Sequence, residues 1–449
     1  MKLFRTLPLI AAMSMAFAGA ARGQSLVELF DAAREYDAGF KSVQLQAQAT
    51  RLKVEQAQAK LGPTVNLNLT ANTNSSSTTY VNTKVAGYTD NTRGYSAEQG
   101  TVAATQPLYR PADNAEVAQA NLQLQLADEQ LRAAEQDLMV RLSQAYFDVL
   151  ASQDTLTFVQ AQLKAVAEQL ASAKRNFEVG TATITDTREA QATYDLVVAQ
   201  EIGASNDLRV KKMALDQLVG KSGISPKAVA LNATPAQPQP ANVDEWVAIS
   251  EQQNASIRQA RIGVDVAALE VKKADAGLRP TLDAQFSYTY QNNINGNAAS
   301  GALDYRVGVA TAALVMNWPL YTGNALNNRV RETMSLSNKA SADLDNATRN
   351  IAQATRAAYF GVVSGVSQVQ ALKAAEESSL VALEANKLGY SVGVRININV
   401  LDAQSKLYDT KAKLAKARYD VLVGHLKLRQ VSGSLQLQDL QDINKLLAP

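Results

Sequence analysis

The chain of 449 residues contains no cysteine and a single histidine, His425. The lack of cysteine excludes disulfide bonds, thiolate zinc sites and cysteine nucleophiles, since each of them needs a thiol group. A Ser-His-Asp arrangement would have to use His425, which lies in a helical stretch, where a histidine is usually structural. The residues therefore predict neither an enzyme nor a cofactor or metal site.

An excess of either charge is also missing. Residues 1–23 carry Lys2, Arg5 and Arg22 and no acidic residue, so the rest of the chain has 44 − 3 = 41 basic and 42 acidic residues. A chain so close to neutral is a poor nucleic-acid binder. We therefore expect no nucleic-acid partner.

Long apolar runs are absent beyond the N-terminus, where the sequence has the features of a secretory signal. Basic residues precede an apolar stretch from Leu7 to Phe17, and small residues follow, so we expect cleavage after Ala20 or Gly23. No other apolar run approaches the roughly 18 residues that a transmembrane helix needs. The chain is predicted to be exported, and it could span a membrane only as a β-barrel.

The remaining sequence is a duplication. Matching short motifs recur at an offset of 213 residues, or 212 in one case, across most of each half. The matches are Ala145-Tyr-Phe147 with Ala358-Tyr-Phe360, Val179-Gly180 with Val392-Gly393, Ala190-Gln191 with Ala403-Gln404, Gly220 with Gly433, and Pro107-Leu-Tyr109 with Pro319-Leu-Tyr321. A Pro-rich segment separates the copies and is typical of an extended linker. The predicted organisation is a signal peptide (1–23), a first repeat (24–232), a linker (233–241), a second repeat (242–433) and a C-terminal tail (434–449).

Each copy is predicted to begin with one helix, over Ser25–Leu61 and Asn242–Leu278, which ends before a proline. Apolar and polar residues then alternate with a period of two, which predicts a strand, as in Val65 to Thr70 and Thr281 to Tyr290. A polar loop leads to a return strand that ends near Tyr109 or Tyr321, although its alternation is poorer.

These strands suit a transmembrane barrel, because each has one apolar and one polar face and aromatic residues near its ends. The aromatic residues that would form girdles are Tyr80, Tyr95, Tyr109, Tyr305, Trp318 and Tyr321. One chain supplies only about four strands, which cannot close a barrel, and an open edge is not tolerated in a bilayer. Several copies must share one barrel, and three would give about twelve strands. A soluble β-sandwich is the alternative that alternation alone leaves open.

Long helices follow the strands in both copies. Ala112–Val179 contains neither glycine nor proline, and its 68 residues would form a helix of about 100 Å. Apolar residues at alternating spacings of three and four run from Leu156 to Phe177, which indicates a coiled-coil seam. A second helix is expected after Gly180, and the second copy is expected to break at Gly389 and Gly393. Each copy is thus predicted to form a strand pair and a long helical hairpin.

The two hairpin turns carry related signatures, Phe177-Glu-Val-Gly-Thr-Ala-Thr-Ile-Thr-Asp186 and Tyr390-Ser-Val-Gly-Val-Arg-Ile-Asn-Ile-Asn-Val-Leu-Asp402. With these signatures and the repeated Ala-Tyr-Phe and Pro-Leu-Tyr motifs, the chain resembles the TolC family of outer-membrane efflux and type I secretion proteins over nearly its whole exported length. The resemblance implies an α+β membrane protein, a homotrimer with one 12-stranded outer-membrane barrel continuous with an α-helical periplasmic tunnel. It also implies a periplasmic adaptor and an inner-membrane transporter of the ABC or RND type as partners, and outer-membrane lipid around the barrel.

The resemblance assigns roles to residues near the two turns. It implies that Asp186, Tyr390 and Arg395, with Thr185 beside them, form the gate network that holds the tunnel entrance shut. Asp402 matches an aspartate ring of the pore constriction, and Asn399 stands where the family's archetype has a second aspartate. The hairpin tips expected to contact the adaptor are Val179, Gly180, Thr181, Val392, Gly393 and Val394.

Two other classes of protein share some of these features. A periplasmic adaptor carries a coiled-coil hairpin, but usually one per chain, whereas this sequence predicts two hairpins at a fixed offset. A self-contained porin needs more strands and less helix than this sequence predicts. The cargo, whether drugs or secreted proteins, is left open by the residues.

Overall fold

The computed structural model describes residues 23–81, 91–230, 236–296 and 303–447. The predicted signal up to residue 22, parts of the two strand-to-strand loops and part of the Pro-rich linker lie outside these ranges. The chain divides into two compact units. Unit 1 is made of Met1–Leu45, Glu129–Gln259 and Asp345–Pro449, and unit 2 of Gln46–Asp128 and Ala260–Leu344. Each unit therefore takes residues from both sequence repeats.

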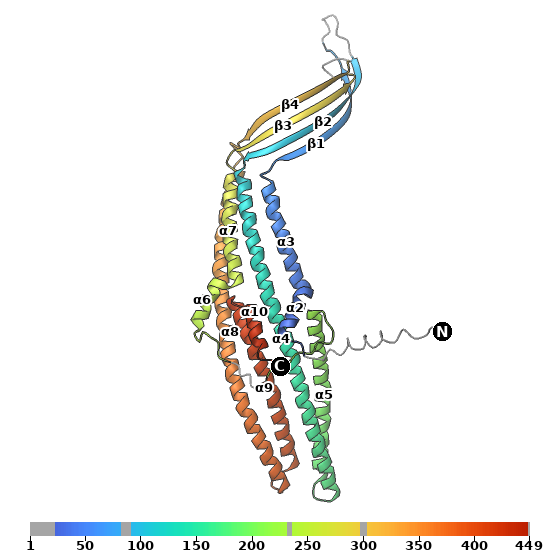
Figure 1. The fold of residues 1–449 in the computed structure, drawn as a ribbon, viewed down its shortest axis with the longest axis vertical. Coiled ribbons are helices and arrows are strands. Elements are labelled where there is room, and N and C mark those ends of the chain that lie inside the picture. Colours follow the sequence, from blue (N-terminus) through green and yellow to red (C-terminus); the bar gives the residue numbers. More distant parts are fainter. Residues whose placement is uncertain (1–22, 82–90, 231–235, 297–302, 448–449) are drawn as a thin grey trace, which may run out of the picture. The chain divides into compact units, whose positions relative to one another are not determined.

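The order of elements is the same in the two repeats (Figure 1). The first repeat contains α2 (Leu26–Tyr36), α3 (Ala38–Ala59), β1 (Thr64–Thr78), β2 (Asn91–Tyr109), α4 (Pro111–Glu178) and α5 (Ile184–Val219). The second contains α6 (Val243–Gln253), α7 (Ala255–Ala276), β3 (Thr281–Ile294), β4 (Tyr305–Asn317), α8 (Ala325–Ser391) and α9 (Asn397–Ser432). The tail forms α10 (Leu437–Asn444). No helix in the described ranges is both long and apolar enough to cross a membrane.

The prediction of a single helix at the start of each repeat is wrong. Asp37 leaves the helical conformation between α2 and α3, and its carboxylate accepts a hydrogen bond from the backbone N–H of Phe40 at 2.7 Å. Asn254 does the same between α6 and α7, where its side-chain oxygen accepts from Ser256 N and Ile257 N. Short polar side chains compete for backbone donors in this way, which ends one helix and caps the next.

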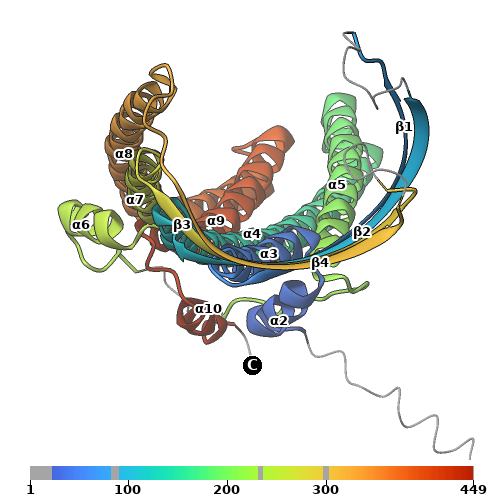
Figure 2. The same ribbon diagram turned by 90° about the horizontal axis from the view of Figure 1, so that it is seen from above.

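The four strands of unit 2 form one antiparallel sheet in the order β1-β2-β3-β4, which is curved when seen from above (Figure 2). The sequence predicts a polar loop over Asn74–Gly94, but β1 extends to Thr78 and β2 begins at Asn91, so both strands reach into it. β4 ends at Asn317, so Tyr321 lies beyond the strand that was predicted to lead to it. Tyr95 and Tyr305 lie near one end of the sheet, and Tyr109 and Trp318 lie near the other.

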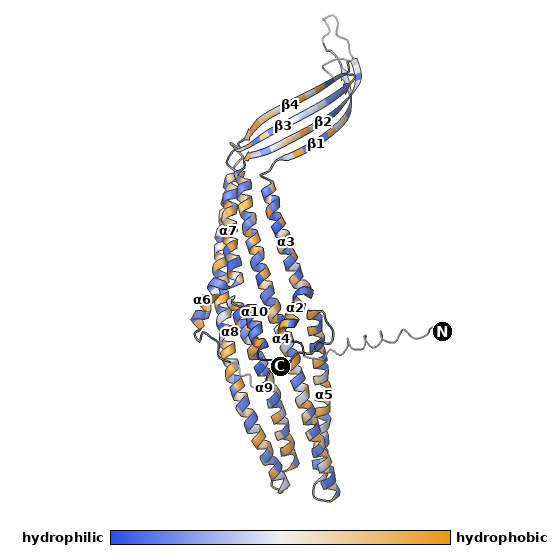
Figure 3. Cartoon of the chain, viewed as in Figure 1, coloured by the Kyte–Doolittle hydropathy of each residue, from blue (hydrophilic) through white to orange (hydrophobic). Residues whose placement is uncertain are grey.

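The register of the strands collects apolar residues on one face of the sheet, and the mixture of apolar and polar positions is visible in Figure 3. Leu67 pairs with Val102, Val102 with Tyr288 and Tyr288 with Ala310, so the four form one cross-strand row. Val65, Ala104, Phe286 and Ala312 form the next row. Leu67 is 66% exposed and Phe286 53%, so this apolar face has no cover within the described chain. The opposite face is polar on β1 to β3, as in the row of Asn68, Thr101 and Thr289, to which β4 adds Val309.

The main core of unit 1 is built from helices that are distant in the sequence. It joins α2, α4, α5, α9 and α10, and its fully buried members include Phe30, Leu142, Tyr146, Leu215 and Leu426. The repeated tyrosine of the Ala-Tyr-Phe motif has the same role twice. Tyr146 donates a hydrogen bond to the Lys227 carbonyl at 2.9 Å, and Tyr359 donates to the Ala241 carbonyl. Each tyrosine therefore anchors a connecting segment to the long helices.

Candidate functional site at the hairpin tips

Both long hairpins of unit 1 turn in the same way. Gly180 and Gly393 have φ values of +77° and +78°, a conformation that favours glycine. Thr181 N donates to the Asn176 carbonyl at 2.8 Å, and Val394 N donates to the Gly389 carbonyl at 2.8 Å, the hydrogen bond of a Schellman cap. The turns predicted at these two glycines are confirmed. The break predicted at Gly389 is wrong, because α8 continues to Ser391.

The second helix of each hairpin begins differently. Thr183 and Asp186 form a capping box at the start of α5, in which the Asp186 carboxylate accepts from Thr183 N at 2.9 Å and from the Thr183 hydroxyl at 2.7 Å. The corresponding residues in the second repeat, 213 positions later, are Ile396 and Asn399. Ile396 makes no side-chain cap at the start of α9. The start of α9 therefore lacks a local support that α5 has.

The predicted gate residues are brought to the same end of unit 1, on different elements. Tyr390, near the end of α8, accepts a hydrogen bond from Asn176 Nδ2 of α4 at 3.5 Å. Arg395 is exposed and forms no ion pair with any residue in the described ranges, and its stem lies against Gly389, where a methyl group would come within 2.7 Å of Arg395 Cγ. Thr185 is exposed on α5. Among the described residues, Arg395 and Asp186 of the predicted gate network form no ion pair with each other.

A residue that sequence reasoning missed joins the two hairpins. Asn397, the first residue of α9, has no exposed surface. Its Nδ2 donates to the Asp186 carbonyl of α5 at 3.3 Å, and its Oδ1 accepts from Gln169 Nε2 of α4. One side chain of the second hairpin thus bonds to both helices of the first.

Apolar packing beside Asn397 fixes the orientation of α9. Ile398 and Leu401 pack with Val166 and Leu170 of the predicted coiled-coil seam on α4. On the α8 side, Val400 and Leu407 pack with Leu383. Since these contacts hold two sides of α9, Asp402 is left exposed and Asn399, one turn before it, is partly exposed.

The tips themselves present apolar side chains to solvent. Val179 is 73% exposed, Val392 65% and Val394 79%, while Thr181 is also exposed. A methyl group added at Gly180 or Gly393 would contact nothing within 4 Å. Exposed apolar groups gathered at one place are typical of a protein interaction surface.

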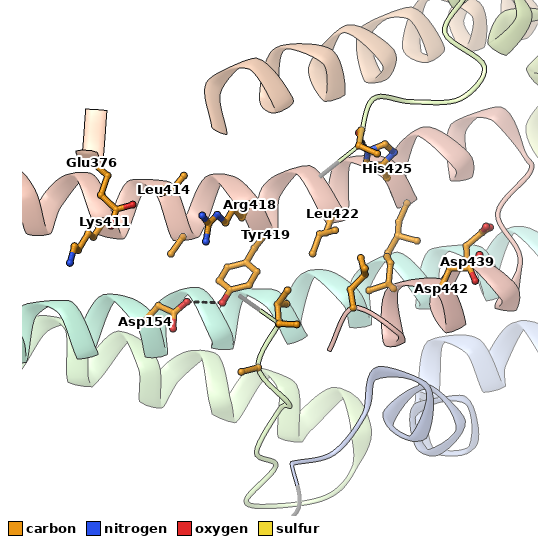
Figure 4. A pocket seen from close by; sticks show the side chains of 18 of the residues that line it. Asp154, Glu376, Lys411, Leu414, Arg418, Tyr419, Leu422, His425, Asp439 and Asp442 are labelled. Carbon is orange, nitrogen blue, oxygen red and sulfur yellow. Dashed lines mark hydrogen bonds between the residues drawn. The ribbon is translucent and has the colours of Figure 1, made fainter. Parts of the chain in front are cut away.

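A cavity of about 1030 Å³ lies elsewhere in unit 1, among α4, α9, α10 and the segments on either side of residues 231–235 (Figure 4). Its apolar wall includes Leu414 and Leu422. At its side the Tyr419 hydroxyl of α9 donates to the Asp154 carboxylate of α4 at 2.6 Å, and burial raises the pKa of Asp154. His425 contacts the Ala236 carbonyl at 2.9 Å, and burial lowers the pKa of this imidazole. No group of three or more metal-ligating side chains occurs among the residues that the structure describes.

Comparison with known proteins accounts for this arrangement. The family model described as "Outer membrane efflux protein" matches residues 29–221 and 246–434, one segment for each repeat. The chain belongs to the outer membrane efflux protein family. It is therefore an outer-membrane protein with an efflux or secretion function, as the sequence predicts.

Relatives of this efflux family match along nearly the whole chain. Outer membrane protein TolC of Vibrio cholerae serotype O1 is 32% identical over 450 residues, which cover 98% of each chain. Proteases secretion protein PrtF of Dickeya chrysanthemi is 27% identical over 430 residues, covering 95% of this chain and 91% of PrtF. The solved structure of the outer membrane protein VceC from Vibrio cholerae has a TM-score of 0.74 at 18% identity, covering 91% of this chain and 96% of VceC. The predicted fold class is confirmed by this likeness.

Proposed function

We propose that three copies of the chain form one channel-tunnel, an exit duct for efflux or type I secretion that crosses the outer membrane of a Gram-negative-type bacterium and reaches into its periplasm. The observation that carries this proposal is the sheet of unit 2. Within the described residues, β1 and β4 each have a neighbour on one side only, and one face of the sheet carries exposed apolar rows that include Leu67 and Phe286. Unpaired strand edges and an uncovered apolar face are stable together only if further strands and lipid cover them.

The number of copies follows from strand count. Because all neighbouring strands are antiparallel, β4 of one copy can pair antiparallel with β1 of the next, and a ring of n copies has 4n strands. Two copies would give eight strands, whose interior is just filled by side chains, whereas three give twelve and leave a lumen. The apolar face would meet outer-membrane lipid, and the rows of Asn and Thr would line the water-filled side.

The helices of unit 1 support the same ring. Exposed apolar side chains lie along α5, including Leu196, Ile202 and Met213, and along α8, including Phe360 and Val381. These are two different surfaces of one chain, so contact between copies would be heterologous, and such contacts generate rings when the rotation closes. The duct is proposed to act as a conduit and not as an enzyme.

The partners are part of the proposal. An exit duct needs an energy-coupled protein that delivers the cargo to it. We propose an inner-membrane transporter of the ABC or RND type, together with a periplasmic adaptor. The exposed valines at the two hairpin tips would receive the adaptor. PrtF is named for protease secretion, which favours a secretion partner as one of the options. We also propose that four residues near these tips hold the tunnel entrance closed, namely Thr185, Asp186, Tyr390 and Arg395.

Mass measurement and conductance test the proposal. Protein purified from outer membranes in mild detergent should have three times the mass of the mature chain, and it should conduct ions in planar lipid bilayers. A stable monomer that still conducts would contradict the shared barrel. Recovery of the chain as a soluble or inner-membrane species would favour the adaptor alternative.

A further inference from the structure

Amide side chains follow one line on α4, beside its coiled-coil seam. Gln162, Gln169 and Asn176 are spaced by seven residues, so they lie on one face of the helix. Two of them donate hydrogen bonds to the second hairpin, Gln169 to Asn397 and Asn176 to Tyr390. Gln162 is only 5% exposed. We name these three residues the amide stripe.

Asn397 is the partner of this stripe that is shielded most completely from solvent. It has no exposed surface, it accepts from Gln169 of the stripe, and it also donates to the Asp186 carbonyl of α5. By contrast, the Asp186 carboxylate bonds within its own capping box, and Arg395 has no ion pair among the described residues. Among the described residues, the most deeply buried polar link between the hairpins at this end is therefore the amide of Asn397.

We propose that Asn397 is a closing latch of the tunnel entrance, which holds the start of α9 against α4 through Gln169 of the amide stripe and against α5 through the Asp186 carbonyl. This inference rests on the proposed channel function. α9 begins without a side-chain cap, so its first turn depends on tertiary contacts, and Asn397 supplies them from inside the packing.

A buried amide has physical properties that suit this role. A hydrogen bond inside a protein is stronger electrostatically than one in water, and it is less screened by salt than an exposed ion pair. The bonds are neutral, so they break without leaving a buried charge. When α9 moves away from α4, water can bond to the freed amide and carbonyl groups, and the link is reversible.

The chain offers a matched control. Gln404 lies on α9 one heptad after Asn397 and is 3% exposed, so it is also a buried amide. Its Oε1 has no hydrogen-bond partner within the described chain. Asn397→Leu removes the two bonds between hairpins, whereas Gln404→Leu removes a buried amide whose oxygen makes none.

The test is single-channel recording of purified trimers in planar bilayers. Asn397→Leu should raise the ratio of open to closed time by about 5- to 30-fold, the factor expected when one or two hydrogen bonds are lost. Gln404→Leu should leave this ratio unchanged. Gln169→Leu should open the channel as well, and the double variant Gln169→Leu/Asn397→Leu should open it no further than Asn397→Leu alone, since both remove one shared bond.

Cross-linking supplies a second readout, in which a covalent link takes the place of the hydrogen bonds of the latch. Because the chain has no cysteine, Gln169→Cys with Asn397→Cys gives a single reactive pair. A short thiol cross-linker should keep this pair in the low-conductance state, even when Tyr390→Phe and Arg395→Ser are added. If the cross-linked channel opens freely, the latch is elsewhere.

The outcomes separate the two proposals. If the wild-type protein forms no trimer and no channel, the proposed function fails. If the wild-type channel conducts and Asn397→Leu behaves as Gln404→Leu does, the channel stands and the latch is overturned. Should Asn397→Leu fail to assemble, Gln169→Leu and the cross-linked pair decide the question.

Discussion

At the residue scale, the two repeats differ at the positions where the second helix of each hairpin begins. Thr183 and Asp186 form a capping box, and the corresponding Ile396 and Asn399 do not. In the next repeat position, Ile184 is 48% exposed, whereas its counterpart Asn397 is fully buried. Two copies of one sequence unit thus keep the same fold while the second copy gives up local helix capping and gains bonds to the first.

The Asp154–Tyr419 hydrogen bond gives a residue-scale prediction. Burial raises the pKa of Asp154, and the Tyr419 hydroxyl acts against this rise because it bonds to the ionised carboxylate. Tyr419→Phe should therefore destabilise unit 1 by about 1 kcal/mol at a pH above the pKa of Asp154, where the ionised carboxylate loses its donor. The loss should shrink as the pH falls through the pKa of Asp154, because a protonated carboxyl group depends less on that donor.

Thermal dissociation of the trimer, followed from neutral to acidic pH, measures this effect. Asp154→Asn is the control, since its amide oxygen can still accept from Tyr419 and carries no buried charge. A Tyr419→Phe loss that stays constant over the whole pH range would show that the variant does not act through the charge of Asp154.

At the element scale, the sequence predicts most of the fold and misses contacts between distant elements. The glycine turns, the 68-residue α4 and the strand pairs follow from the periodicity of apolar residues and from the positions of glycine and proline. The caps at Asp37 and Asn254 carry a local signal, an Asp or Asn before a helical stretch, and could have been found. Asn397 could not, because its burial depends on which face of α9 packs against α4. The spacing of Gln162, Gln169 and Asn176 was the available hint.

The hairpin tips give a prediction for whole elements. Val179 and Val394 are mostly exposed, and the turns that carry them have open space around Gly180 and Gly393. Tryptophan at Val179, Thr181, Val392 or Val394 should therefore leave folding and trimer formation intact and abolish export, because the shape of the docking surface changes. Export assays and cross-linking to the adaptor measure this.

Lys164→Trp is the matched control for the tips, since this exposed residue lies on α4 more than three turns before Gly180. It should export normally. Normal export and adaptor cross-linking in all four tip variants would mean that the adaptor binds elsewhere.

At the scale of the whole molecule, the described residues leave both edges of the sheet and the apolar surfaces of α5 and α8 uncovered, so the proposed function depends on copies closing a ring. The curvature of the sheet suits closure, because a flat sheet would continue to add strands (Figure 2). In such a ring every residue at the entrance occurs three times around one axis. A side chain with a weak effect in one chain is then part of a ring of three identical side chains, whose effects add.

Asp402 gives the last prediction, which holds only for the assembled ring. It is exposed on α9, and Asn399 lies one turn before it without a charge. Three Asp402 carboxylates near one axis should attract cations, and a narrow mouth strengthens their field on passing ions. The channel should therefore be cation-selective, and Asp402→Asn should remove most of this selectivity. Asn399→Asp should strengthen block by multivalent cations from the periplasmic side, because six carboxylates bind such ions more tightly than three.

Reversal potentials in a salt gradient and block titrations measure both effects. Asp442→Asn is the control, since it removes the same charge from α10, a helix that lies away from the tips of α8 and α9 (Figure 1), and since Asp442 pairs with Lys445 at 2.8 Å. This control should keep wild-type selectivity, because its charge is paired and distant from the ion path. If Asp402→Asn leaves selectivity and block unchanged as well, Asp402 does not line the pore, and the exposed face of α9 that carries it points away from the axis of the ring.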